Sequence, residues 1–105
     1  MKLNLIKQVS IFTYVFDIEY DKNSDGASFS FTNRIMKIGI KSIKKDPKYV
    51  LSIISHELME AIFVQLGARY DNICIENNYL FNFNHQTFEN AIQIHTELLT
   101  KFIKQ

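Results

Sequence analysis

The sequence predicts one α+β domain spanning residues 1–105, in which an antiparallel sheet, made of a three-strand meander plus a hairpin, packs against two long helices. Three observations predict this class. Apolar residues make up 47% of the chain and include nine Phe and five Tyr, enough to build a core without disulfides. Apolar and polar residues alternate through the first 40 positions, as in strands. Two longer segments with helical periodicity follow, which gives the order βββ-α-ββ-α.

The first three predicted strands follow this alternation. Residues 8–20 are predicted as one long strand, residues 27–33 as a second and residues 35–41 as a third. A turn cluster rich in Asp, Asn and Gly separates the first two strands, and an Asn-Arg pair separates the last two. Short turns between sequential strands are typical of an antiparallel meander.

Both predicted helices have clear start and stop signals. Asp46 suits an N-cap before Pro47 at the first helical position, and Gly67 suits a C-terminal stop, which predicts a helix over about 47–66. Asn84 suits the N-cap of a second helix over about 85–104. The apolar face predicted for this second helix consists of Phe88, Ile92, His95, Leu99 and Phe102.

A hairpin is predicted between the two helices. Residues 73–76 and 79–83 flank Asn77 and Asn78, which tolerate the positive φ of a tight turn. Cys74 has no Cys or His partner at metal-ligand spacing, so a packing role is expected for it. A single cysteine also excludes an internal disulfide, which favours a reducing, cytoplasmic location.

Charge and hydropathy exclude several functional classes. A net charge of +1 gives no global attraction to nucleic acid or to a membrane. The stretch 34–48 carries six basic residues against one acidic residue, for which a solvated surface is expected and a nucleic-acid patch is the weaker alternative. The apolar segment 49–68 has the length of a membrane span, but His56, Glu57 and Glu60 lie at its centre, so a buried helix is predicted. No signal peptide is expected, because acidic residues follow the first apolar stretch at once.

The segment Ser55-His56-Glu57-Leu58-Met59-Glu60 contains the residues that suggest chemistry. His56 and Glu60 are four residues apart, so they lie about 40° apart on one helix face. The rest of that face is mostly apolar, and an unpaired imidazole and carboxylate there are costly to bury. A divalent cation satisfies both, since His and Glu are ordinary zinc ligands. Glu57 is offset by about 100° from His56, where a general base beside the metal belongs.

This segment resembles the active-site helix of zincin metallopeptidases, whose signature is H-E-x-x-H, whereas this chain has H-E-x-x-E. The wider context is similar to the small zincin-like proteins of phages and mobile elements. The matching stretches are Asp25-Gly26, Phe29-Ser-Phe31, Asn33-Arg-Ile-Met-Lys-Ile38 and Ile53-Ile-Ser-His-Glu-Leu58. The resemblance covers roughly residues 20–70 and implies zinc-dependent hydrolysis of a peptide or protein substrate. It also implies that Glu57 transfers the proton and that residues 35–40 form an edge strand that pairs with the extended substrate.

The resemblance further implies a third metal ligand from downstream. His85 is the best candidate, so that His56, Glu60 and His85 form a set of two histidines and one carboxylate. Glu89, one turn after His85, is placed either to orient it or to replace it as a ligand, and His95 is the reserve candidate. Helix capping for His85 and a hydrogen-bonded core position for His95 are the structural alternatives.

Two alternatives to catalysis stay open at this point. Glu60 stands where the second histidine of the zincin signature belongs, which favours a catalytically inactive, zincin-like protein with a binding or regulatory role. A salt bridge from Arg69 to Glu57 or Glu60 would satisfy the acidic residues without any metal. The metal content of the purified protein separates the metal site from both alternatives.

Overall fold

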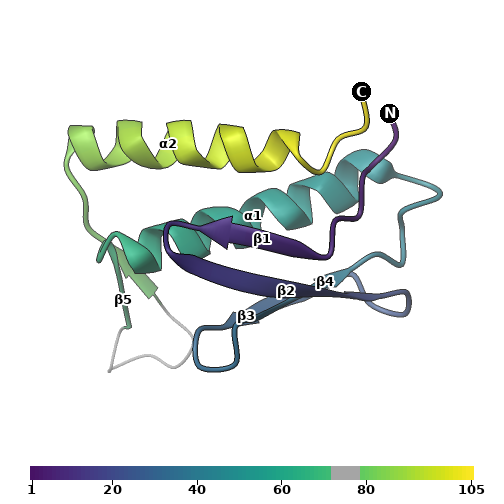
Figure 1. Ribbon diagram of the computed structural model, residues 1–105, viewed down its shortest axis with the longest axis horizontal. Helices are drawn as coiled ribbons and strands as arrows, with labels where there is room; N and C mark the ends of the chain where they lie inside the picture. Colours follow the sequence, from purple (N-terminus) through teal and green to yellow (C-terminus); the bar gives the residue numbers. More distant parts are fainter. Residues whose placement is uncertain (72–78) are drawn as a thin grey trace.

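The structure is a computed structural model that describes residues 1–71 and 79–105. It has an α+β fold in three layers, with a four-stranded sheet, a helix against one face of that sheet, and a second helix on the far side of the first (Figure 1). The elements in chain order are β1 (Gln8–Ile11), β2 (Tyr14–Asp21), β3 (Ala27–Ser30), β4 (Ile35–Gly39), α1 (Pro47–Gln65), β5 (Arg69–Asp71), β6 (Tyr79–Phe81) and α2 (His85–Thr100).

The predicted long strand over residues 8–20 is in fact a hairpin. β1 and β2 pair antiparallel, with Val9 opposite Phe16, and the chain turns at Phe12, which has a φ of 56°. Phe12 and Tyr14 are exposed, whereas Phe16 lies in the core. The alternation of apolar residues therefore continues across the turn and hides it from sequence reasoning.

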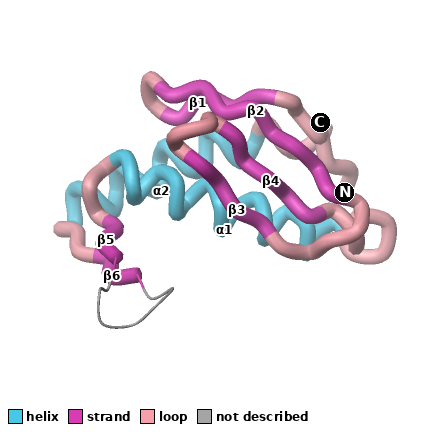
Figure 2. The backbone as a smooth tube through the Cα atoms, turned by 90° about the horizontal axis from the view of Figure 1, so that it is seen from below, coloured by secondary structure: helices cyan, strands magenta, loops and turns pink. Residues whose placement is uncertain are grey.

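The sheet is mixed, so the predicted antiparallel meander is wrong. The strand order is β1-β2-β4-β3, with β4 parallel to β2 and antiparallel to β3 (Figure 2). Met36 and Ile38 of β4 are fully buried, as expected for a central strand. The predicted edge strand over residues 35–40 is thus central, and β3 is the edge strand on that side of the sheet.

A close backbone contact lies next to the end of β4. The Gly39 N–H donates a hydrogen bond to the Gly26 carbonyl at 2.7 Å, and a Cβ added at Gly39 would lie 2.3 Å from the Ser24 carbonyl oxygen. Only glycine permits that approach, because any side chain would collide with backbone that cannot swing away. Gly39 therefore lets the 21–26 turn lie directly against the end of β4.

Helix α1 begins and ends where its sequence signals predict. The Asp46 carboxylate accepts a hydrogen bond from the Tyr49 N–H at 3.1 Å, Pro47 opens the helix, and Gly67 follows its end with a φ of 69°. The helix contributes much of the core, through Val50, Ile54, Leu58, Ala61 and Ile62. No helix within the described residues is long and apolar enough to cross a membrane.

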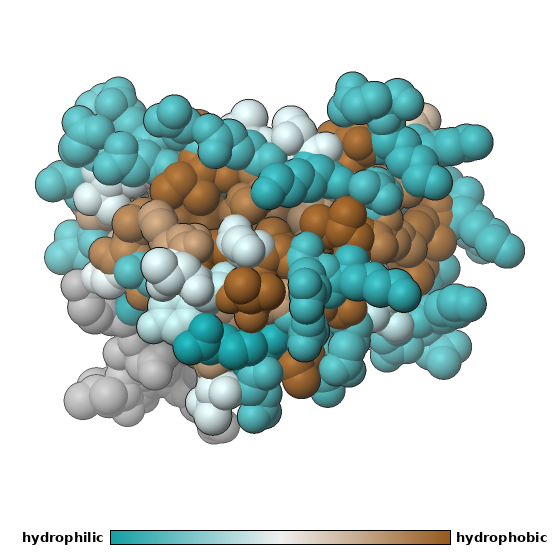
Figure 3. All heavy atoms as spheres, in the orientation of Figure 1, coloured by the Kyte–Doolittle hydropathy of each residue, from teal (hydrophilic) through white to brown (hydrophobic). Residues whose placement is uncertain are grey.

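Helix α2 is capped as predicted, and its predicted apolar face is buried only in part, since Phe102 is fully buried and Leu99 packs against the core. The Asn84 side chain accepts a hydrogen bond from the Thr87 N–H at 2.8 Å, and the helix ends at Thr100, earlier than expected. Ala91 and Leu98 are buried against α1, while Phe88 and Ile92 of the predicted apolar face are exposed. The outer helix α2 packs on α1, so only a narrow stripe of it is covered. Hydrophobic side chains consequently reach the surface in a band between α2 and β2 (Figure 3).

A separate two-stranded sheet lies at the C-terminal end of α1. β5 pairs antiparallel with β6, with Tyr70 opposite Leu80. The sequence predicts β6 but places its partner at residues 73–76. That predicted strand, the Asn77-Asn78 turn and Cys74 lie outside the described residues.

Candidate metal centre

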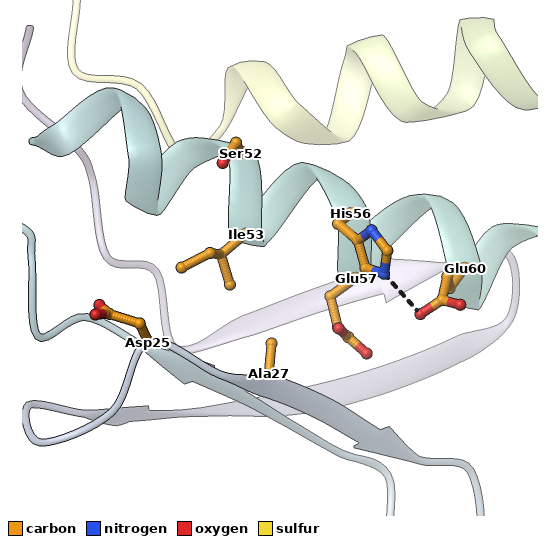
Figure 4. Close-up of a pocket in the computed structure, with 7 residues that line it drawn as sticks. All are labelled: Asp25, Ala27, Ser52, Ile53, His56, Glu57 and Glu60. Carbon is orange, nitrogen blue, oxygen red and sulfur yellow. Dashed lines mark ion pairs between the residues drawn. The ribbon is translucent and has the colours of Figure 1, made fainter. Parts of the chain in front are cut away.

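The middle of α1 brings together three side chains that suit a metal ion. The ligand atoms of His56, Glu57 and Glu60 all lie within 4.8 Å of one another. His56 Nε2 lies 3.1 Å from Glu60 Oε2 across one helical turn (Figure 4). Over residues 1–71 and 79–105, this is the one group of three His, Cys, Asp or Glu side chains that converge in this way. The i, i+4 pairing predicted from the sequence is therefore present.

The three side chains differ sharply in exposure. The His56 side chain is 69% exposed and the Glu60 side chain 21%, whereas Glu57 as a residue is only 4% exposed. Figure 4 shows the Glu57 carboxylate directed from α1 toward the sheet, on the side of Ala27. The group thus has a solvent-facing imidazole and a carboxylate at its floor, which is an open arrangement rather than a closed structural cage.

The buried carboxylate of Glu57 is poorly compensated. Burial, followed by the negative charge of Glu60, raises the pKa of Glu57, while His56 and Arg69 act in the opposite direction. Within the part of the chain that the structure describes, its carboxylate makes no ion pair closer than 4.0 Å. A cation bound at His56 and Glu60 would offset the negative charge of Glu60 that acts on Glu57.

A hollow of about 520 Å³ opens between α1 and the edge strand β3. Ala27 of β3 forms one wall, Ile53 of α1 forms another, and the three charged side chains of the metal centre close one end. Asp25, at the other end, is held by the Ser42 N–H and hydroxyl, each 3.2 Å from a carboxylate oxygen. This size lies in the range of small-ligand sites.

Within the described residues, no strand pairs with the edge of β3 that faces this hollow, so backbone groups there are unpaired. The bond from the Gly39 N–H to the Gly26 carbonyl sets the register of the β3–β4 pair. Backbone groups in an antiparallel pair point alternately toward and away from the partner, so Ser28 and Ser30 continue the ladder with β4. The N–H and C=O groups of Ala27 and Phe29 therefore point away from β4, toward the free edge.

The other sequence-predicted residues lie elsewhere. His85 Nε2 is 2.9 Å from Glu89 Oε1 at the exposed start of α2, so His85 is paired with Glu89 as expected but is outside the three-residue group. Its role as third ligand stays a prediction. His95 Nε2 lies 2.9 Å from Ser55 Oγ between the two helices, which fits the alternative of a hydrogen-bonded core position.

The salt bridge considered for Arg69 is not formed with Glu57 or Glu60. The Arg69 guanidinium instead lies 3.6 Å from the centre of the Tyr79 ring and 5.4 Å from that of Phe29. Sequence reasoning missed this stacking, because it depends on β5, β6 and β3 meeting in space. It also missed the role of β3 as the strand beside the site.

Comparisons with known proteins give no further guidance, because no family model, curated protein or solved structure matches the chain. The function is therefore inferred from the geometry around α1 and β3.

Proposed function

We propose that the chain is a zinc-dependent hydrolase that cleaves peptide bonds, with His56 and Glu60 as metal ligands. The convergence of three ligand atoms within 4.8 Å beside the free edge of β3 is the observation that carries this proposal. The resemblance of residues 20–70 to small zincin-like proteins points to the same chemistry.

The donor set fits a divalent cation. His56 supplies an imidazole nitrogen and Glu60 a carboxylate oxygen, both common zinc donors, and open coordination positions suit catalysis. The buried Glu57 and the half-buried Glu60 give the centre two negative charges for a cation to neutralise. A bound zinc ion would supply polarisation of a carbonyl and acidification of water.

The neighbouring residues supply binding and proton transfer. An extended peptide pairs with the outward-facing backbone groups of Ala27 and Phe29, which aligns it along β3 and above α1. Glu57 points from α1 into the same hollow, within reach of a peptide held there. It takes a proton from water during attack and returns it to the leaving amine.

A second candidate function is peptide binding without catalysis on the same scaffold. The observation that favours it is the chemistry of the group itself, which holds one histidine and two glutamates. Such a set carries more negative charge than a centre with two histidines, and it therefore acidifies water less strongly.

A cleavage assay with matched variants separates the two candidates. Zinc-loaded protein is incubated with a library of internally quenched fluorescent peptides, and the products are identified by mass spectrometry. Glu57→Gln should retain zinc and lose about 10²–10⁴-fold in cleavage rate, the usual contribution of proton transfer. Glu97→Gln, an exposed change on α2, is the control and should cleave as the wild type does. Zinc binding with no cleavage of any peptide would assign the non-catalytic function.

A further inference from the structure

A second hollow lies on the opposite side of the metal centre from β3. It measures about 520 Å³, and its walls are Ser55, Met59, Phe63, Phe81 and Phe83. His56 and Glu60 border this hollow as well as the one beside β3. The ion pair of α1 therefore stands between a polar hollow and an apolar one, so that a single ligand can occupy both.

The aromatic walls of this hollow are ordered by contacts with one another. The rings of Phe63 and Phe83 stack with centres 4.9 Å apart and planes 11° apart. Phe81 meets Phe63 edge-on at 5.6 Å, and Phe88 of α2 stacks on the outer side of Phe83 at 5.7 Å. Phe63 is buried in the core, so it anchors the other rings. A ligand that enters finds walls already in place and pays little ordering entropy.

Two of these rings are nevertheless partly exposed to water. Phe81 is 45% exposed and Phe83 is 38% exposed. Covering apolar surface of this kind is favourable by about 25 cal/mol per Å². Because the exposed rings adjoin a charged centre, the ligand that covers them combines an apolar group with a polar backbone.

We infer that the apolar hollow receives a large apolar side chain, aromatic or branched aliphatic, of the peptide whose backbone lies at His56 and Glu60. This inference rests on the proposed function for the peptide itself and adds the residue class that the site selects. A side chain directed away from β3 passes the ion pair and enters between Met59 and the Phe63–Phe83 stack. Small or acidic side chains at that position leave the rings uncovered or meet the Glu60 carboxylate.

Peptide binding tests this inference without requiring turnover. Two fluorescein-labelled Ala-Ser hexapeptides, one with an internal Phe and one with Ala in its place, are titrated with zinc-loaded protein carrying Glu57→Gln. The Phe peptide should bind at least about 10-fold more tightly, as expected for one well-buried apolar group. Phe81→Ala in the same background should reduce that preference to less than about threefold, because it removes one wall of the hollow.

Leu80→Ala is the matched control, since Leu80 is exposed on the same strand but does not line the hollow. It should preserve the preference for the Phe peptide. If Phe81→Ala does not fold, Met59→Trp fills the hollow instead and should weaken binding of the Phe peptide alone.

Three outcomes overturn the inference. These are equal affinity for the two peptides, a preference that survives both Phe81→Ala and Met59→Trp, and a protein dimer that dissociates in Phe81→Ala, which would assign the hollow to a second copy of the chain. Zinc binding without cleavage contradicts the proposed hydrolysis and leaves this preference intact. If the protein cleaves peptides but shows no preference for the Phe peptide, only the inference about the apolar hollow is contradicted.

Discussion

His56 and Glu60 face each other across one turn of α1, with His56 Nε2 and Glu60 Oε2 3.1 Å apart. The pair itself needs only a helix at this position. The tertiary structure adds the buried carboxylate of Glu57 beneath it and the free edge of β3 beside it. A local ion pair is thereby converted into one wall of a ligand-sized hollow.

In the metal-free protein, Glu57→Gln should raise the free energy of unfolding at pH 7. Burial and the nearby Glu60 raise the pKa of Glu57 above its ordinary value of 4.5. A raised pKa in the folded state contributes stability below pH 4.5, and this contribution is lost as the pH rises through the folded-state pKa. The gain from Glu57→Gln should therefore shrink as the pH falls toward 4.5. Urea denaturation at both pH values measures it.

Zinc should reduce the gain in stability from Glu57→Gln, because the nearby cation offsets the charge of the ionised carboxylate. Glu97→Gln on the exposed side of α2 is the control and should change stability equally little at both pH values. A Glu57→Gln protein that is less stable than wild type at pH 7 without metal would contradict the account of Glu57.

Tyr20 should control part of the loss of stability at alkaline pH. Its hydroxyl donates a hydrogen bond to the Ile6 carbonyl, and burial raises the pKa of Tyr20 to about 12. In the unfolded chain the Tyr20 hydroxyl ionises near pH 10. The stability that Tyr20 contributes is therefore complete below pH 10 and is lost between pH 10 and 12. Tyr20→Phe should cost about 1 kcal/mol at pH 8 and then lose less than wild type on going to pH 12.

The exposed Tyr49→Phe serves as the control for Tyr20 and should follow the wild-type pH profile of stability. Guanidinium titrations at pH 8, 10 and 12 give the comparison. If wild type and Tyr20→Phe lose the same free energy of unfolding between pH 8 and 12, Tyr20 has no part in the alkaline loss of stability.

Gly39→Ala should destabilise the fold by more than about 3 kcal/mol, because the new methyl group meets the Ser24 and Gly26 carbonyls rather than a flexible side chain. Gly26→Ala is the control: its nearest contact is the Ser24 hydroxyl at 3.4 Å, so it should change stability by less than about 0.5 kcal/mol. Thermal melting of both variants distinguishes them. Similar melting temperatures would contradict the close approach of Gly39 to the Ser24 and Gly26 carbonyls.

Sequence reasoning located the helices because their signals are local. Asp46 and Asn84 each cap the helix that follows, and Gly67 stops α1 as expected. The sequence did not predict contacts between residues that are far apart along the chain. The turn at Phe12 continues the alternation of its flanking strands, and β4 lies between β2 and β3 beside a close backbone approach at Gly39 that no local pattern predicts.

The candidate site likewise has one part that the sequence predicts and another that depends on the tertiary structure. The spacing of His56 and Glu60 predicts their contact, because four residues make one helical turn. The burial of Glu57 depends on how β3 lies against α1, and the apolar hollow depends on Phe81 and Phe83 reaching Phe63. No local sequence pattern predicts these contacts.

Calorimetric titration with zinc tests the cation site most directly. The wild type should bind one equivalent, and His56→Ala should bind more than about 100-fold more weakly, since a ligand is lost. His85→Ala, which removes the imidazole paired with Glu89, decides in the same experiment whether His85 supplies a third ligand. Manganese, calcium and magnesium titrations establish whether zinc is preferred. Equal zinc affinity in wild type and His56→Ala would contradict the account, leaving His56, Glu57 and Glu60 as a structural cluster.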